Sequence, residues 1–150
     1  MTVLRYFTVY GPAGGPDMSI CRFIRWIDEG SPLIVFGDGT QQRDFTYVDD
    51  IAAGTVAALC RAGFAMYNLG SDRPVRLDFV IGLIEEELAR SSKVEHRPAH
   101  RADVKATWAS IGRARSDLEW APTVPIEEGI EKTVSWYRDH QTVARSIAIT

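Results

Sequence analysis

The chain has few of the residues that build disulfide frameworks and metal sites. It contains two cysteines and three histidines in 150 residues. Cys21 and Cys60 both fall in predicted helices, where they are interpreted as small buried hydrophobic residues. The three histidines, which are His96, His100 and His140, lack the spacing of metal ligands. The sequence therefore predicts neither a disulfide nor a metal site.

Long apolar runs and an excess of charge of one sign are missing as well. No run reaches the length of a membrane helix, and no signal peptide is recognised. The net charge of −3 gives no indication of nucleic acid or an anionic membrane as a partner. With 45% hydrophobic and 25% charged residues, the composition is that of a globular domain, which we expect in the cytoplasm.

The centre of the predicted fold is the stretch Arg43–Ile51, with the sequence RDFTYVDDI. Its alternation predicts a short strand, and Asp49 is placed to cap the helix that follows. Arg43 precedes the strand, next to a polar turn, where a guanidinium can bind a phosphate through two parallel hydrogen bonds. The alternative is a surface arginine paired with Asp38 or Asp44.

Hydrophobic periodicity predicts the remaining elements. Strands are expected at Val3–Val9, Pro32–Phe36 and Phe64–Leu69, with a short edge strand at Lys93–Arg97. Helices are expected from a cap at Asp17 to Gly30, from Ile51 to Ala62, around Leu77 to Leu88, from a cap at Ser110 to Leu118, and from about Pro125 onward. The opening strand is apolar almost without alternation, which is typical of a strand buried on both faces of a parallel sheet. Its neighbours are expected in residues outside these 150.

Five stretches, in order along the chain, resemble the extended short-chain dehydrogenase/reductases, the nucleotide-sugar epimerase/dehydratase family. They are LRYFTVYGP at 4–12, IVFGDG at 34–39, RDFTYVDD at 43–50, YNLG at 67–70 and DVKATWA at 103–109. The version at 7–12 most resembles the UDP-glucuronate 4-epimerase branch. The resemblance extends to about Arg138, but it covers only the C-terminal half of the family.

The resemblance implies an α/β fold, with the C-terminal part of a doubly wound Rossmann-type sheet and a small α/β substrate-binding domain. Residues 1–150 would be a single substrate-binding portion, without the N-terminal NAD-binding half. The glycine-rich dinucleotide fingerprint and the catalytic Ser/Thr and Tyr-x-x-x-Lys do not occur in these residues. We therefore expect a UDP-sugar 4-epimerase that uses NAD when complete, no catalytic residue in this chain, and self-association through the unpaired strand Val3–Val9.

The same resemblance implies binding roles for eight residues. Tyr6 would lie against the nicotinamide of NAD. The substrate-binding residues would be Thr8 at the sugar, Arg22 and Arg43 at the diphosphate, Ile34 and Phe36 at the uracil, and Arg101 and Asp103 in a loop that matches the family's R-x-G-D imperfectly. Taken alone, Arg22 and Arg25 read as a solvated helix face, and Phe36 reads as a core residue.

One position departs from the glucuronate branch. Gly15 stands seven residues after Thr8, where that branch has an arginine that pairs with the sugar carboxylate. A buried carboxylate without a partner is costly, so this glycine counts against a glucuronate substrate. A UDP-glucose 4-epimerase, a decarboxylase and a 4,6-dehydratase remain alternatives, as does a non-catalytic protein that binds a nucleotide sugar or a partner chain.

Overall fold

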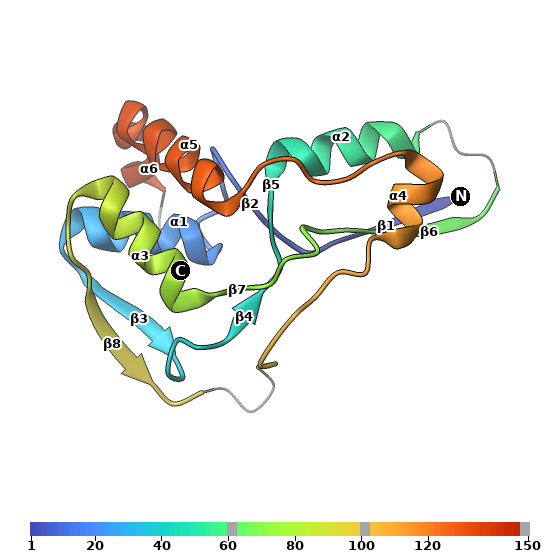
Figure 1. Cartoon of the computed structure of the whole chain (residues 1–150). Helices are drawn as coiled ribbons and strands as arrows, with labels where there is room; N and C mark the ends of the chain where they lie inside the picture. Colours follow the sequence, from blue (N-terminus) through green and yellow to red (C-terminus); the bar gives the residue numbers. More distant parts are fainter. Residues whose placement is uncertain (60–62, 100–102, 148–150) are drawn as a thin grey trace.

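The computed structural model describes residues 1–59, 63–99 and 103–147 of the chain. Its strands are β1 (Thr2–Tyr6), β2 (Thr8–Tyr10), β3 (Pro32–Phe36), β4 (Gln42–Arg43), β5 (Phe45–Tyr47), β6 (Ala65–Leu69), β7 (Val75–Arg76) and β8 (Lys93–Arg97). Its helices are α1 (Ser19–Glu29), α2 (Val48–Ala58), α3 (Leu77–Leu88), α4 (Gly112–Leu118), α5 (Ile126–Asp139) and α6 (Gln141–Ser146). Parallel strand pairs flanked by helices make this an α/β fold, which confirms the predicted class (Figure 1).

The strands pair two by two, and the first predicted strand is wrong as a single element. β1 runs parallel to β6, β2 to β5 and β3 to β8, whereas β4 and β7 are antiparallel. The chain changes partner at Phe7, whose N–H donates to the carbonyl of Leu69 at 3.1 Å. The residues of β1 are partly buried or exposed within these 150 residues, so the expected burial on both faces stays a prediction.

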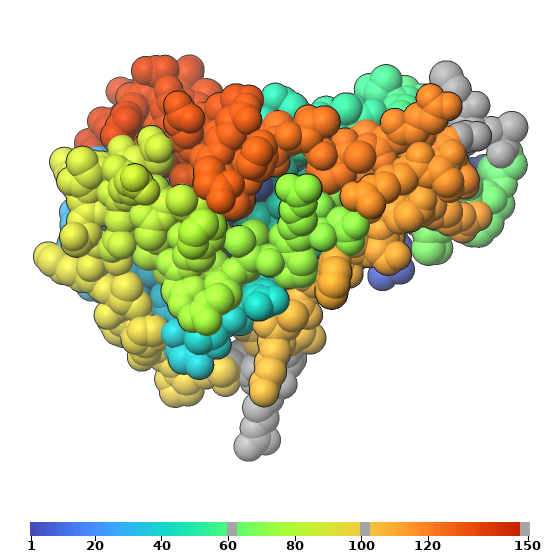
Figure 2. Space-filling view, in the orientation of Figure 1, coloured from blue at the N-terminus to red at the C-terminus, as the bar shows by residue number. Residues whose placement is uncertain are grey.

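The larger hydrophobic core lies where α1, α3 and α5 pack around β3 and β5. Each of these helices buries apolar residues at helical spacing, although Ile126 at the start of α5 is only partly buried. The buried stripe residues are Ile20, Phe23, Ile24 and Ile27 of α1, Leu77, Ile81, Ile84 and Leu88 of α3, and Ile130, Val134 and Tyr137 of α5. This core forms the broad part of the molecule in the space-filling view (Figure 2).

A second core lies where α2 and α4 cover one face of the β1–β6 pair. It forms the narrower part of the molecule in Figure 2. Gly54 allows α2 to approach the sheet closely, because a Cβ there would lie 2.9 Å from Leu69 Cδ1 and 3.0 Å from the ring of Trp120. Trp120 closes this core, and its indole Nε1 donates to the carbonyl of Asp50 at 2.9 Å.

The predicted helix caps are wrong by one or two residues. Asp17 and Ser110 each lie one residue before the N-cap, and neither α1 nor α4 has a side-chain cap. Asp49 lies inside the first turn of α2, whose N-cap is Tyr47. A carboxylate in the first turn still interacts favourably with the helix dipole, so Asp49 stabilises α2 without capping it. α2 ends at Ala58, with Leu59 as its C-cap, whereas Cys60 and the predicted end at Ala62 lie outside the described residues.

Candidate functional site

A cleft of about 420 Å³ gathers five of the residues that the sequence proposes for substrate binding. They come from three parts of the chain, which are α1, the β3–β4 region and the segment before α4. The five are Arg22, Ile34, Phe36, Arg43 and Asp103, and they share the cleft with Ser19, Phe23, Trp26, Val35, Gln41 and Leu77. Both Arg22 and Arg43 line this cleft.

Arg43 is fixed at this cleft by three acceptors. Its guanidinium donates to the carbonyl of Gln42 at 2.8 Å, to the carbonyl of Val104 at 2.9 Å, and to the carboxylate of Asp103. The alternative pairing with Asp38 or Asp44 is therefore wrong. The guanidinium holds the segment that begins at Asp103 against β4. Its position suits the binding of an anion, but an anionic ligand would have to compete with the carboxylate of Asp103.

The N-terminal end of α1 opens toward the same cleft, through its first residue Ser19. α1 has no side-chain cap and no acidic residue in its first turn, so its free N–H groups and dipole favour an anion there. Arg22 lies one turn further on, with its guanidinium carbon 5.6 Å from the centroid of the Trp26 ring. The interpretation of Arg22 as part of a solvated face is wrong, because the residue is partly buried in the cleft wall.

Phe36, Ile34 and Trp26 contribute apolar surface to the cleft. Phe36, at the end of β3, is 49% exposed, so the alternative that it belongs to the core is wrong. Ile34 is partly buried on the same strand. Trp26 was not predicted as a site residue, although its position four residues after Arg22 places both on one face of a helix.

The other predicted site residues lie apart from this cleft or outside the described residues. Thr8 lines a small hollow of about 20 Å³, which shares only Ser19 with the cleft. Tyr6 ends β1 in the narrower part of the molecule, is 49% exposed, and shares a hydrogen bond of 2.9 Å with the hydroxyl of Thr55. Arg101 lies outside the described residues.

The first carboxylate of the central motif, Asp44, is structural and was not predicted as such. Asp44 is completely buried, and its two oxygens accept the backbone N–H groups of Ser71 at 2.5 Å, Asp72 at 3.2 Å and Ala109 at 2.8 Å. A Cβ on Gly70 would lie 2.2 Å from that of Ala109, so the close approach of these segments requires glycine there. Asp44 thus ties the turn after β6 and the segment before α4 to the strand that follows Arg43.

A second motif carboxylate, Asp50, performs the same task for the segment before α5. It accepts the N–H and the hydroxyl of Thr123 at 3.0 and 2.8 Å, and the N–H of Val124 at 3.0 Å. The central motif therefore places one arginine at the cleft and uses two aspartates to hold distant segments around it.

The loop at 11–16 has no cationic side chain. A Cβ at Gly15 would lie 2.7 Å from the carboxylate oxygen Oδ1 of Asp17. The position that would hold a positive charge in the glucuronate branch is therefore next to a negative one. Arg25 of α1 lines a hollow with Gly14 and Pro16 of this loop, but it donates to Glu29 at 2.8 Å and to the carbonyls of Ala144 and Ile147.

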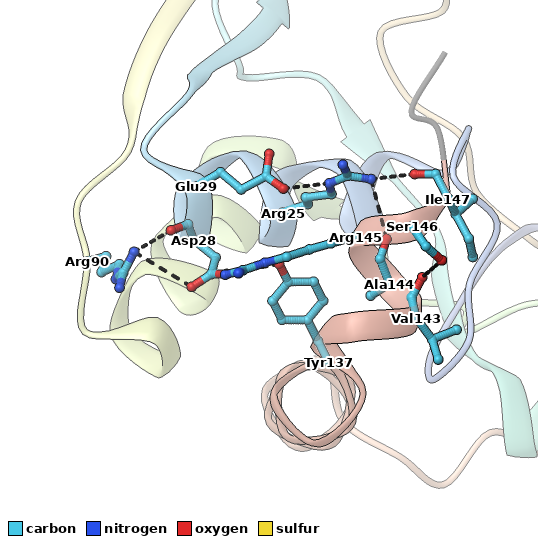
Figure 3. A network of polar contacts seen from close by, with 10 residues as sticks. All are labelled: Arg25, Asp28, Glu29, Arg90, Tyr137, Val143, Ala144, Arg145, Ser146 and Ile147. Carbon is cyan, nitrogen blue, oxygen red and sulfur yellow. Dashed lines mark hydrogen bonds and ion pairs between the residues drawn. The ribbon is translucent and has the colours of Figure 1, made fainter.

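An ionic cluster around the buried carboxylate of Asp28 lies at the opposite end of α1 (Figure 3). Asp28 accepts from the hydroxyl of Tyr137 at 2.9 Å and from Arg145 at 2.7 Å, while Arg90 lies 3.6 Å away. Burial acts to raise the pKa of the Asp28 carboxyl, but the hydrogen bonds from Arg145 and Tyr137 and the nearby positive charges lower it overall. The cluster anchors α6 to α1. Arg25 also connects α1 to this region, because it donates to the carbonyls of Ala144 and Ile147, so the interpretation of Arg25 as part of a solvated face is wrong.

Comparison with known proteins shows what the chain is similar to. A model of the NAD dependent epimerase/dehydratase family matches residues 1–70. The chain is similar to known epimerases beyond these residues as well. It is 49% identical over 150 residues to a UDP-glucuronate 4-epimerase of Thermodesulfobacterium geofontis, and the match covers 99% of this chain and 46% of that protein.

Two solved structures show the same arrangement of elements. The UDP-glucuronic acid 4-epimerase of Bacillus cereus, in complex with UDP-glucuronic acid and NAD, matches with a TM-score of 0.86 and 38% identity over 92% of this chain and 45% of that one. The UDP-glucose 4-epimerase of Thermotoga maritima, with UDP-glucose, matches with a TM-score of 0.88 and 29% identity over 93% and 46%. The chain spans about half the length of the relatives it matches.

The described residues offer neither a metal site nor a membrane helix. No group of three or more His, Cys, Asp or Glu in residues 1–59, 63–99 and 103–147 is arranged to hold a metal ion. In the same residues, no helix has the length and apolar character needed to cross a membrane.

Proposed function

We propose that this chain is the nucleotide-sugar-binding part of an NAD-dependent UDP-sugar 4-epimerase, and that it has no epimerase activity by itself. The observation that carries the proposal is the cleft at the N-terminal end of α1, which combines two arginines with the apolar surfaces of Ile34 and Phe36. Relatives of known structure in complex with UDP-glucuronic acid or UDP-glucose support it.

The diphosphate of such a ligand fits the charged end of the cleft. Arg22, Arg43 and the uncapped N-terminal end of α1 supply positive charge from three directions. Bidentate contact with a guanidinium and bonds from free N–H groups are the usual ways in which proteins hold a phosphate. The ligand would have to compete with Asp103 for Arg43, so we expect binding to loosen the contact between these two residues.

The sugar end favours a neutral sugar. The loop at 11–16 offers no cation, and Asp17 lies next to Gly15, so a carboxylate brought to this loop would meet a like charge. UDP-glucose and its neutral relatives are therefore better candidates than UDP-glucuronate, although relatives of both specificities match the chain. A dehydratase or decarboxylase that binds the same nucleotide sugar remains the alternative.

The residues of this chain do not form a dinucleotide site of their own. The glycine-rich fingerprint that cradles a pyrophosphate is not in the sequence, and Tyr6 offers a single half-exposed ring whose hydroxyl is bound to Thr55. NAD would supply hydride transfer in the complete enzyme. Tyr6 could contact only a small part of the NAD molecule.

Titration calorimetry with UDP, UMP and uridine tests the proposal directly. We expect the affinity to fall from UDP to UMP to uridine, because each phosphate lost removes contacts with the arginines and with α1. Equal affinity for UDP and uridine would show that the cleft does not bind the diphosphate. Failure to bind any of the three compounds would overturn the proposal.

A further inference from the structure

A hollow of about 270 Å³ lies apart from the cleft, on the face shown in Figure 2. Residues of the segment 71–75, green in that view, form one wall, and residues 122–127, orange, form the other. Arg115 of α4 and Phe45 of β5 complete the described lining. None of these residues lines the cleft, although Phe45 also lines the small hollow beside Thr8. We call this site the front hollow.

Two buried carboxylates of the central motif hold both walls in place. Asp44 accepts the backbone N–H of Ser71 at 2.5 Å. Asp50 accepts the backbone N–H of Val124 at 3.0 Å. Phe45, between the two aspartates in sequence, is 3% exposed and belongs to the larger core. The front hollow is therefore pre-formed, so a ligand would bind without the entropy cost of ordering its walls.

The positive side of the front hollow consists of two arginines. Arg73 is exposed, and its guanidinium forms no hydrogen bond or ion pair with any residue that the structure describes. Arg115, also exposed, lies 3.5 Å from the carboxylate of Asp72, which already accepts a hydrogen bond from Trp108 at 2.8 Å. A guanidinium presents paired N–H donors that fit a carboxylate or a phosphate. This side of the hollow therefore favours an anion.

A glutamate on the opposite wall limits the charge of that anion. Glu127 is an exposed residue in the first turn of α5 and lines the front hollow. With two arginines and one glutamate, the described lining carries a net charge of +1. A monoanion matches this charge, whereas the second charge of a dianion would be repelled by the glutamate carboxylate. The lining therefore favours a single carboxylate over a phosphate monoester.

The remaining lining is mostly apolar and suits the body of a small molecule. Three prolines, which have no N–H group, contribute hydrocarbon surface next to Phe45 and three aliphatic side chains. Besides Phe45, the apolar residues are Pro74, Val75, Pro122, Val124, Pro125 and Ile126. At about 270 Å³, compared with about 420 Å³ for the cleft, the front hollow suits a ligand smaller than a nucleotide sugar.

We propose that the front hollow binds a small monocarboxylate with an apolar body. Its carboxylate would accept hydrogen bonds from Arg73 and Arg115, and its body would lie against Phe45 and the prolines. Burial of the apolar body supplies affinity, and the arginines select the charge. The proposal goes beyond the nucleotide-sugar function and does not rest on it, because the cleft and the front hollow share no described lining residue.

Benzoate and benzamide test the proposal on the 150-residue chain, because they share a ring and only benzoate is charged. Backbone amide shifts in NMR titrations report both the affinity and the place of binding. We expect benzoate to shift amides of 71–75 and 122–127 and to bind about fivefold more tightly than benzamide. Arg73→Ala should lower the benzoate affinity about fivefold and leave that of benzamide unchanged. Arg113→Ala, which removes an exposed arginine of α4 outside the front hollow, is the control and should change neither.

Glu127→Gln tests the charge limit. Terephthalate carries a second carboxylate at the far end of the same ring, so this variant should raise the affinity for terephthalate about fivefold and that for benzoate less. Equal benzoate affinity in Arg73→Ala and the unmodified protein, or shifts confined to residues of the cleft, would overturn the proposal. Benzoate binding that persists in excess UDP supports a separate site, whereas displacement of benzoate by UDP would contradict it. A failure of UDP to bind would count against the proposed function alone.

Discussion

The guanidinium of Arg43 binds the carboxylate of Asp103, 60 residues further along the chain, at the mouth of the cleft. The contact holds the segment before α4 beside β4, where Gln42 and Ala106 form a parallel bridge. One side chain therefore both shapes the cleft wall and provides its charge. Replacing it should affect binding more than folding, because both partners retain access to water.

Arg43→Ala should weaken UDP binding by about 1.5–3 kcal/mol, the range for hydrogen bonds that involve charged groups. Calorimetry measures this difference. Arg113→Ala is the matched control, since Arg113 is an exposed arginine that does not line the cleft, on the helix α4, which lies apart from α1 and β3 in Figure 1. Equal UDP affinity in the Arg43→Ala and unmodified proteins, with an unchanged far-UV spectrum, would exclude the role of Arg43.

Gly15→Arg should shift the preference between sugars toward UDP-glucuronate. The glycine has no backbone strain to relieve, and the Asp17 carboxylate that a new side chain would meet is at the end of a flexible group. The new arginine will pair in part with Asp17, which weakens its effect on the ligand. We therefore expect the difference in binding free energy between the two sugars to change by about 1 kcal/mol, or roughly fivefold in the ratio of the two dissociation constants. Gly15→Gln adds similar bulk without the charge, and a similar shift in that control would mean that the carboxylate is not what the arginine recognises.

Asp44→Asn should destabilise the fold strongly, although the change in shape is small. An amide cannot accept all three N–H groups from Ser71, Asp72 and Ala109, so at least one buried donor loses its partner. We expect a loss of about 3 kcal/mol in the free energy of unfolding, measured from urea midpoints. Asp49→Asn changes an exposed carboxylate five residues away and should cost less than about 1 kcal/mol. Similar losses in both variants would show that Asp44 has no special structural role.

Stability should fall in acid through Asp28. Its pKa in the folded protein lies below the ordinary value of 3.8, so its contribution is complete above that value and is lost as the pH falls through the folded pKa. Asp28→Asn should therefore lower stability at neutral pH and flatten the acid side of the stability profile. Asp139→Asn, an exposed carboxylate on α5, is the control. Parallel acid limbs for Asp28→Asn and the unmodified protein would contradict the assignment.

The isolated chain should not interconvert UDP-glucose and its C4 epimer. Proton transfer needs a positioned group of suitable pKa, and no tyrosine in the sequence is followed four residues later by lysine. The chain is incubated with NAD and the UDP-sugar, and the products are resolved by chromatography. Turnover above the blank would require a second catalytic arrangement within these residues.

Sequence reasoning was most accurate where the signal is local. β3 occupies the predicted residues Pro32–Phe36, and the stripe of α3 is buried as its spacing predicts. Periodicity reports which side of an element faces a core, but not which strand lies beside it. The change of partner at Phe7 therefore left no signal, because the apolar run continues through it.

The candidate site was predicted in its residue types but not in its contacts. Arg22, Arg43, Phe36 and Asp103 were predicted as site residues by resemblance, whereas the pairing of Arg43 with Asp103 was not predicted. Asp44 makes its bonds to backbone groups 27 to 65 residues away, and such contacts have no fixed spacing in a sequence. Trp26 was overlooked because an aromatic residue at helical spacing is more often part of a core.

The three residues of β2 form the partition between the two cores. Val9 packs against the core under α2, and Tyr10, the next residue, is buried in the core of α1, α3 and α5. Successive side chains of a strand point in opposite directions, so one short strand supplies a wall to each. Each core needs β2 to be complete. If β2 leaves one core, it leaves the other as well, and apolar residues of both become exposed to water. The two hydrophobic cores should consequently unfold together, in one cooperative transition.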